Sequence, residues 1–295
     1  MTDGVALGPG APARREFQAV GLVVAAHFMS HFYQFVLPPV FALMAAKLGV
    51  GFTEMGLAIT VFSVATGLSQ TPAGFLVDRL GAAKLLALGT GVLGGAVALY
   101  GLAPSYWALL PLVALAGMAN SIYHPADFAI LSGVVAERRI GRAFSLHAVS
   151  GNLGWAAAPF AMLGLAAWFD LETAFLAVGL AGVALAGLLA LNLRRLEEEA
   201  PRRTAHDGGD GAASGSASGS GTAPRGGTTR DGLALLLSRA ALMLFAFQLV
   251  YAMAFAGVRN FSVVALPRIS DVSAEAVAGA LTGYLLAASF GNLMG

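Results

Sequence analysis

The side chains best suited to proton chemistry lie inside long apolar segments of this chain, where ionisable groups are costly. Asp127 is the only acid in the interior of these segments, because Glu275 lies at the edge of the last one, and His124 precedes Asp127 by three residues. Asp127 lies ten residues before Glu137, the centre of the expected turn to the next segment, and His147 lies ten residues after it. Antiparallel packing of the two helices therefore brings Asp127 and His147 to a similar depth, close enough to the cytoplasmic surface for Asp127 to be partly hydrated.

Histidine titrates near neutrality, and an adjacent carboxylate tunes it. We therefore expect His124, Asp127 and His147 to take up and release a proton. The alternative is a fixed structural bond between the two helices.

A second set of polar side chains is a candidate lining for a solute cavity. His27 and His31 are four residues apart and Gln34 is three further on, so all three share one face of a helix. The alternative is that helix contacts satisfy the two histidines. Their spacing would suit a metal ion, but the chain has no Cys and no third ligand near them in sequence. We expect no metal and no cofactor.

Three further residues are candidates for the same cavity. Asn120 lies on the helical face of His124, and Asn152 and Arg259 interrupt other apolar segments. An arginine in this setting either binds an anionic group of the solute or extends to the outer surface.

The composition indicates which elements must position these groups. Of the 295 residues, 57% are hydrophobic and 11% are charged, whereas soluble domains carry about 25% charged residues. A soluble enzyme is excluded, and the fold class is an all-α polytopic membrane protein. The absence of Cys excludes disulfides and Cys nucleophiles, and the net charge of +1 gives no reason to expect nucleic acid as a partner.

Eight apolar segments are long enough to cross a lipid bilayer. They cover residues 17–45, 56–77, 85–103, 106–135, 143–168, 173–193, 233–266 and 274–295. A cleavable signal peptide does not fit, because the first segment is far longer than the apolar region of one.

The basic residues predict the orientation of these segments in the inner membrane. If the N-terminus is cytoplasmic, 14 of the 17 basic residues lie on the cytoplasmic side: Arg14, Arg15, Arg79, Lys84, Arg138, Arg139, Arg142, Arg194, Arg195, Arg202, Arg203, Arg225, Arg230 and Arg239. Lys47, Arg259 and Arg268 fall toward the other face. The excess of basic residues inside favours a cytoplasmic N-terminus.

Three regions follow from this pattern. Residues 1–193 form a six-helix bundle, residues 194–232 form a flexible Gly/Ser-rich cytoplasmic linker, and residues 233–295 begin a second bundle with two helices. An offset of 221 pairs Lys47 with Arg268 and Gly74 with Gly295, which indicates an internal repeat of the kind found in secondary transporters.

The loop after the second segment reads Gly74-Phe-Leu-Val-Asp78-Arg79-Leu-Gly81-Ala-Ala-Lys84. It resembles the loop signature of the major facilitator superfamily, in which an acid and a base follow a glycine and a second glycine precedes basic residues. Gly81 permits the tight turn. Ala83 stands where the family has another basic residue. The resemblance implies two helical bundles around a central site, with this loop controlling conformational change.

Further motifs resemble the fosmidomycin-resistance type of facilitator transporter. They are Tyr123-His124-Pro125, and Gly151-Asn152-Leu-Gly154-Trp155 in the following segment. Two departures are Val113, where drug/proton antiporters of the family have arginine, and Ala158 before Pro159, where they have glycine. The resemblance implies that a complete member has about four more helices, and it favours efflux.

The predicted function is secondary transport of a small organic solute by alternating access, coupled to protons or another ion, in a lipid bilayer. The alternatives are an integral membrane enzyme that uses the histidines, an uptake carrier without proton coupling, and a sensor that does not transport.

Overall fold

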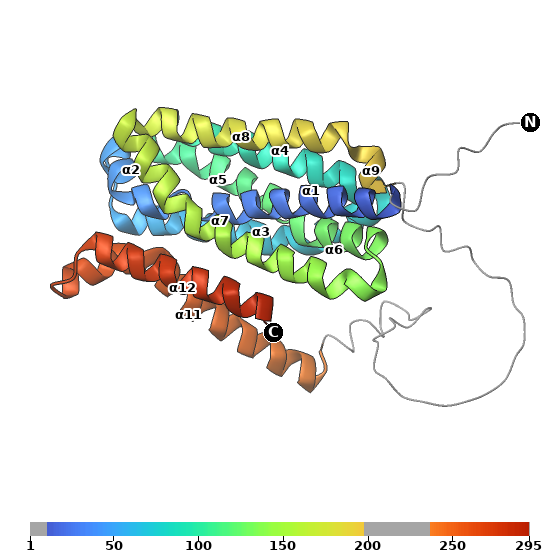
Figure 1. The fold of residues 1–295 in the computed structure, drawn as a ribbon. Helices are drawn as coiled ribbons and strands as arrows, with labels where there is room; N and C mark the ends of the chain where they lie inside the picture. Colours follow the sequence, from blue (N-terminus) through green and yellow to red (C-terminus); the bar gives the residue numbers. More distant parts are fainter. Residues whose placement is uncertain (1–10, 198–236, 295) are drawn as a thin grey trace, which may run out of the picture.

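The computed structural model describes residues 11–197 and 237–294, and throughout these ranges the chain is helical with no strand (Figure 1). The longer helices are α1 (Ala11–Gln34), α3 (Phe52–Leu80), α4 (Ala82–Tyr100), α5 (Tyr106–Asn120), α6 (Tyr123–Val134), α7 (Ile140–Trp168), α8 (Leu171–Leu191), α11 (Arg239–Ile269) and α12 (Ala274–Met294). The short elements are η1 (Pro38–Val40), α2 (Phe41–Leu48), η2 (Glu137–Arg139) and α9 (Leu193–Glu197). The all-α fold is therefore as predicted.

Two of the predicted spans are each divided into two helices. The first divides into α1 and α2, because Pro38 and Pro39 have no N–H group with which to continue the helical hydrogen bonds. The fourth divides into α5 and α6 at Ser121 and Ile122. Pro125 lies in the first turn of α6, where its missing N–H would have had no partner within the helix.

Six spans of the described chain are long and apolar enough to cross a membrane, two of them made of the paired helices on either side of these breaks. The predicted fifth span, α7, has 29 residues but falls outside this group, because polar and small residues lower its hydropathy. The predicted eighth span has only a short apolar stretch, Gly279–Gly291, among its described residues.

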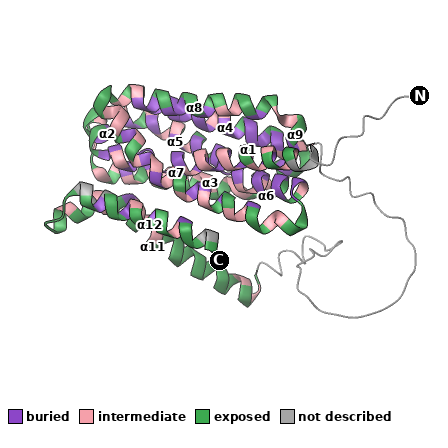
Figure 2. Cartoon of the chain, viewed as in Figure 1, coloured by how far each residue is buried: buried purple, intermediate pink, exposed green. Residues whose placement is uncertain are grey.

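The first six spans form a bundle whose buried residues lie in its interior (Figure 2). Within it α1 packs along α7, and α4 packs against both α5 and α8. Helix α12 lies against α7, whereas α11 is largely exposed in the described structure (Figure 2). Helix α7 therefore stands between the buried face of α1 and the α11–α12 pair.

Ion pairs join helices at both ends of the bundle. At the end predicted to be outside, Lys47 pairs with Glu172 at the start of α8 and donates to the Gly101 carbonyl. At the other end, Arg139 forms a bidentate pair with Glu16 of α1, with Nε 2.7 Å from Oε1. Such two-point guanidinium contacts fix orientation as well as distance.

The predicted boundaries of the three regions remain predictions. Residues 193–197 form α9, so the chain is still helical where the linker is predicted to begin. Most of the predicted linker, from residue 198 onward, and the first residues of the predicted second bundle lie outside the described residues.

Candidate functional site

Three helices meet at a buried carboxylate. Asp127 of α6 is 0% exposed, and its Oδ2 lies 3.0 Å from Nδ1 of His27 in α1 and 3.0 Å from Nε2 of His147 in α7. The structure thus contains the Asp127–His147 contact that the spacing around Glu137 suggests. The expectation that Asp127 is partly hydrated is wrong, because the carboxylate is fully buried where α1, α6 and α7 meet.

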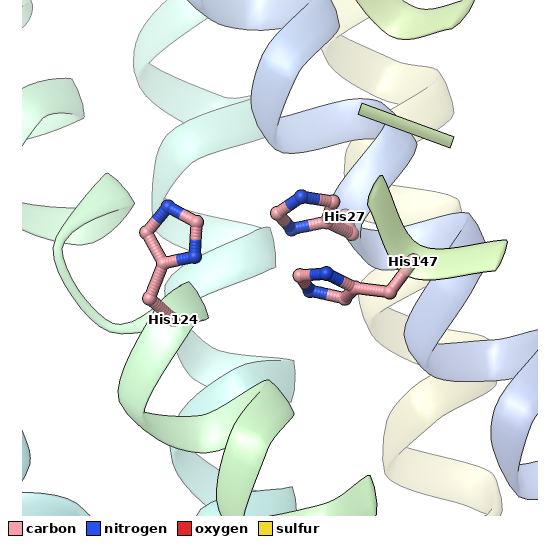
Figure 3. A group of neighbouring side chains, drawn as sticks. All are labelled: His27, His124 and His147. Carbon is pink, nitrogen blue, oxygen red and sulfur yellow. The ribbon is translucent and has the colours of Figure 1, made fainter. Parts of the chain in front are cut away.

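His27 is part of this group and is not free to face a solute. It is 2% exposed, and its ring stacks on that of His147 with centroids 3.5 Å apart and planes 25° apart (Figure 3). His124 of α6 is turned toward the pair, with its ring centroid 5.3 Å from that of His27 (Figure 3). We call these four residues, Asp127, His27, His124 and His147, the His–Asp cluster.

One nitrogen from each of the three imidazoles in the cluster lies within 4.8 Å of the other two. Three nitrogens on a tetrahedral zinc ion stand roughly 3.3 Å apart, given bond lengths of about 2.0–2.1 Å. The rings would have to close around an ion from their present positions, and two of them are engaged with Asp127. The arrangement is a candidate ligand set, and the expectation that the chain holds no metal stays a prediction.

A seam of small residues on α7 lets α1 approach closely enough to build the cluster. A Cβ atom on Gly154 would lie 2.3 Å from the backbone oxygen of Phe28, and one on Gly151 would lie 2.7 Å from the ring of His31. Small residues at helix contacts are the usual way in which membrane helices reach such distances. The glycine motif thus positions His27 against His147.

His31 connects the cluster to a cavity between the six-helix bundle and the last two helices. Its ring centroid lies 4.4 Å from that of His27 and 4.2 Å from that of Trp155 in α7. The Arg259 guanidinium of α11 also lies over Trp155, with Cζ 4.1 Å from the ring centroid. Arg259 therefore faces inward, as favoured from the sequence.

The cavity has a volume of about 860 Å³ and is lined by Asn152 and Arg259 among the predicted cavity residues, and also by His124, a member of the predicted proton-handling group. The remaining polar lining includes Gln248, Tyr251 and Tyr284. Pockets that bind small molecules have volumes of roughly 300–1,000 Å³. The space is therefore of a size that suits a small organic solute.

Four of the six predicted cavity residues do not line this cavity: His27 and His31, whose contacts are given above, and Asn120 and Gln34. Asn120, at the end of α5, accepts a hydrogen bond of 2.7 Å from Ser30 of α1, because the break after Ser121 separates it from the face of His124. Gln34, the last residue of α1, is half-buried and does not line this cavity. Asn120 and Gln34 differ from the expectation because each is the last residue of its helix, whereas the predicted spans extend beyond both.

The predicted loop motif lies at the turn between α3 and α4. Gly81 has a φ of 96°, a conformation that favours glycine, and a Cβ there would meet Oε1 of Glu197 at 2.9 Å. Lys84 Nζ lies 4.0 Å from the same oxygen. Asp78 and Arg79 are exposed, and Gly74 is half-buried. Glu197 falls in the predicted linker, yet it contacts this turn.

Some site residues were not identified from the sequence. Trp155 stands in the glycine motif, but tryptophan in an apolar segment gives no signal for a cavity wall. The Glu16–Arg139 pair joins residues 123 positions apart, and neither one lies in a motif. Only the spatial contact reveals these roles.

Comparison with known proteins gives one family. A sequence model described as Major Facilitator Superfamily matches residues 23–295. The Fosmidomycin resistance protein of Escherichia coli K12 is 26% identical over 179 residues, which cover 58% of this chain and 44% of that protein. A Na(+), Li(+), K(+)/H(+) antiporter of Planococcus maritimus is 31% identical over 137 residues, covering 44% and 32%. The chain thus spans less than half the length of these two relatives.

A solved structure has a similar fold. It is a bacterial homolog of the human lysosomal transporter Spinster in an inward-facing, unoccupied conformation, with a TM-score of 0.72 and 16% identity. The match covers 97% of this chain and 62% of that one. At this identity the likeness concerns the fold alone.

Proposed function

The chain belongs to the major facilitator superfamily, and from this premise we propose that it acts in secondary transport of a small organic solute by alternating access, coupled to protons. In this proposal the solute occupies the cavity lined by Asn152, Trp155 and Arg259. The matching relatives and the solved structure described above are not enzymes, so the membrane-enzyme alternative is set aside.

The observation that carries proton coupling is the buried Asp127 carboxylate, whose Oδ2 lies 3.0 Å from one nitrogen of each of two stacked imidazoles. A charge buried away from water must be paired or neutralised. Protonation of any member changes the net charge of the cluster and therefore the free energy of keeping α1, α6 and α7 together. Proton binding is therefore linked to the packing of these helices. Proton-coupled alternating access requires such a link.

The three helices that meet at the carboxylate each contribute at least one imidazole. Helix α1 brings His27 and His31, α6 brings His124, and α7 brings His147. Arg259 of α11 lies over the ring of Trp155, which His31 also contacts. His124 also lines the cavity, so it is the member we assign to proton exchange with cavity water.

The turn between α3 and α4 is proposed to stabilise one conformation. Asp78 and Arg79 form no ion pair with the residues that the structure describes, and Lys84 reaches only Glu197. Exposed charges at such a turn are available to a neighbouring helix in one state and to water in the other. Gly81 allows the backbone to make this turn.

Efflux is proposed because drug resistance and cation/proton antiport appear in the names of two relatives. The inner membrane with a cytoplasmic N-terminus is proposed from the basic residues, of which 14 of 17 fall on one side when the spans are threaded in order.

The experiment is solute-driven proton movement in proteoliposomes that carry a pH-sensitive dye in their lumen. We expect at least one member of a panel of small organic acids, bases and neutral toxic compounds to move protons through the wild-type chain. Asp127→Asn and His147→Ala should each abolish this signal. Glu137→Gln is the matched control, because Glu137 is an exposed acid near the same end of α7 and should leave the signal unchanged.

Full proton movement in Asp127→Asn would overturn the proton assignment. Flux of labelled solute that ignores the pH gradient in the wild type would instead identify a carrier without proton coupling.

A further inference from the structure

The cavity between the bundle and the last two helices contains one permanent charge among its described lining residues. That charge is Arg259, and no acid lines the space with it. Of the other polar groups, His124 is titratable, and the rest, including Asn152, Gln248 and the two tyrosines Tyr251 and Tyr284, are neutral hydrogen-bonding side chains. The cavity is therefore positive.

Arg259 is held in place by aromatic rings and not by a counter-ion. Its Cζ lies 4.1 Å from the ring centroid of Trp155 and 5.3 Å from that of Phe255. Its Nε is buried and has no hydrogen-bond partner in the described part of the chain. A guanidinium inside a membrane that keeps unused donors is a functional-site candidate by default, because leaving it unpaired is costly.

The chemistry of this arrangement selects the ligand. A guanidinium recognises planar oxyanions through paired N–H groups. A single guanidinium neutralises one negative charge, so a second charge on the ligand would be buried without a partner. Trp155, Phe255 and Tyr251 supply flat apolar surface beside it, which suits a ring or an unsaturated body.

We propose that this cavity binds a monoanionic organic carboxylate, with the carboxylate on Arg259 and the apolar body of the ligand against Trp155. The proposal rests on the transporter proposed above, because it assigns a chemical class to that transporter's solute. Cations are repelled by Arg259, and neutral solutes leave its donors unused.

The three tryptophans of the chain provide a direct measurement. Trp107 and Trp168 are 78% and 84% exposed and lie outside the cavity, so the double substitution Trp107→Phe and Trp168→Phe leaves Trp155 as the only tryptophan. The full chain in detergent is titrated with benzoate, with its neutral isostere benzamide, and with the dianion terephthalate.

We expect saturable quenching by benzoate, with affinity at least about tenfold higher than for benzamide and for terephthalate. Arg259→Gln should weaken benzoate binding by about 10- to 100-fold and remove the preference over benzamide. Arg268→Gln is the matched control. Arg268 is in the same helix and stacks over Phe52 with Cζ 4.4 Å from the ring centroid, outside the cavity.

Four results would overturn the proposal: no saturable quenching by benzoate, equal affinity for benzamide, unchanged affinity in Arg259→Gln with an unaltered melting temperature, or an equal loss in Arg268→Gln. Tighter binding of terephthalate would overturn the monoanion assignment. Equilibrium binding is measured without a proton gradient, so it tests the ligand proposal separately from transport. An Asp127→Asn variant that binds benzoate but moves no protons would support both the ligand proposal and the proton assignment. Benzoate binding without flux through the wild-type chain would refute the transport proposal and leave the ligand proposal standing.

Discussion

Replacing Gly154 by alanine tests whether the small-residue seam of α7 holds the His–Asp cluster together. The new Cβ would lie 2.3 Å from the backbone oxygen of Phe28 and 2.9 Å from the backbone nitrogen of Phe32. The first distance is about 1 Å shorter than ordinary contact, which begins at 3.4 Å. Both contacts are backbone atoms of α1, so no side-chain rotation relieves them, and α1 must move away from α7.

Gly154→Ala changes the free energy of unfolding in two opposed ways. Alanine gains about 0.5–1 kcal/mol over glycine in a helix interior. Overpacking a close contact costs about 1–3 kcal/mol. Gly164→Ala isolates the first part, because Gly164 is in the same helix and a Cβ there meets nothing within 4 Å. The difference between the two variants is therefore the cost of the clash.

The assay is thermal unfolding of the detergent-purified chain, followed by tryptophan fluorescence. A clash of about 1–3 kcal/mol should lower the melting temperature of Gly154→Ala by roughly 2–10 °C relative to Gly164→Ala. A shift of about 1 Å between α1 and α7 would also stretch the His27–Asp127 contact from 3.0 Å, so proton movement in proteoliposomes should fall. If Gly154→Ala melts at or above the temperature of Gly164→Ala, the seam does not set the distance between these helices.

Three further predictions concern other parts of the chain. Tyr33→Phe removes a buried 2.7 Å hydrogen bond to a carbonyl of α8 and should destabilise the chain by about 1 kcal/mol, seen as a melting temperature lower by about 2–4 °C; an unchanged value would mean that water replaces the bond. Asp170→Ala removes the N-cap of α8. The hydrogen bond from the Thr173 N–H lowers the pKa of Asp170 in the folded chain. The stability that this bond contributes is therefore present above the ordinary carboxyl pKa of about 3.9, and it is lost as pH falls through the lowered pKa of the folded chain. The two melting curves should therefore differ at neutral pH and converge in acid, and a difference that persists in acid would contradict the capping role. Since the chain has no Cys, single cysteines report topology cleanly: an impermeant maleimide added to spheroplasts should label Pro104→Cys and not Ala136→Cys, and the reverse result would invert the proposed orientation.

The sequence predicts the helical fold and one contact of the cluster, because both depend on local spacing. Apolar run lengths predict the spans, and equal distances from Glu137 predict that Asp127 meets His147. Both features need only the period of a helix and one turn.

The place of His27 was not predictable in this way. It lies 100 residues from Asp127, and its contact depends on how far α1 sinks into the seam of α7 and on its rotation about its own axis. Helix spacing alone permits His27 to face any neighbour. The break before Tyr123 had a visible signal, Pro125, but a proline in the first turn of one helix and a proline inside a longer helix look the same in sequence.

The turn at Gly81 joins two helices of very different length. Helix α3 has 29 residues and α4 has 19, which at about 1.5 Å per residue correspond to roughly 43 Å and 28 Å. The hydrocarbon layer is about 30 Å thick, so α4 matches it while α3 exceeds it and must tilt or protrude. In a thinner bilayer α3 therefore tilts before α4 does. The angle between the two helices then changes at the turn that carries Asp78 and Arg79. We therefore expect lipid composition to act on the same loop that is proposed to stabilise one conformation.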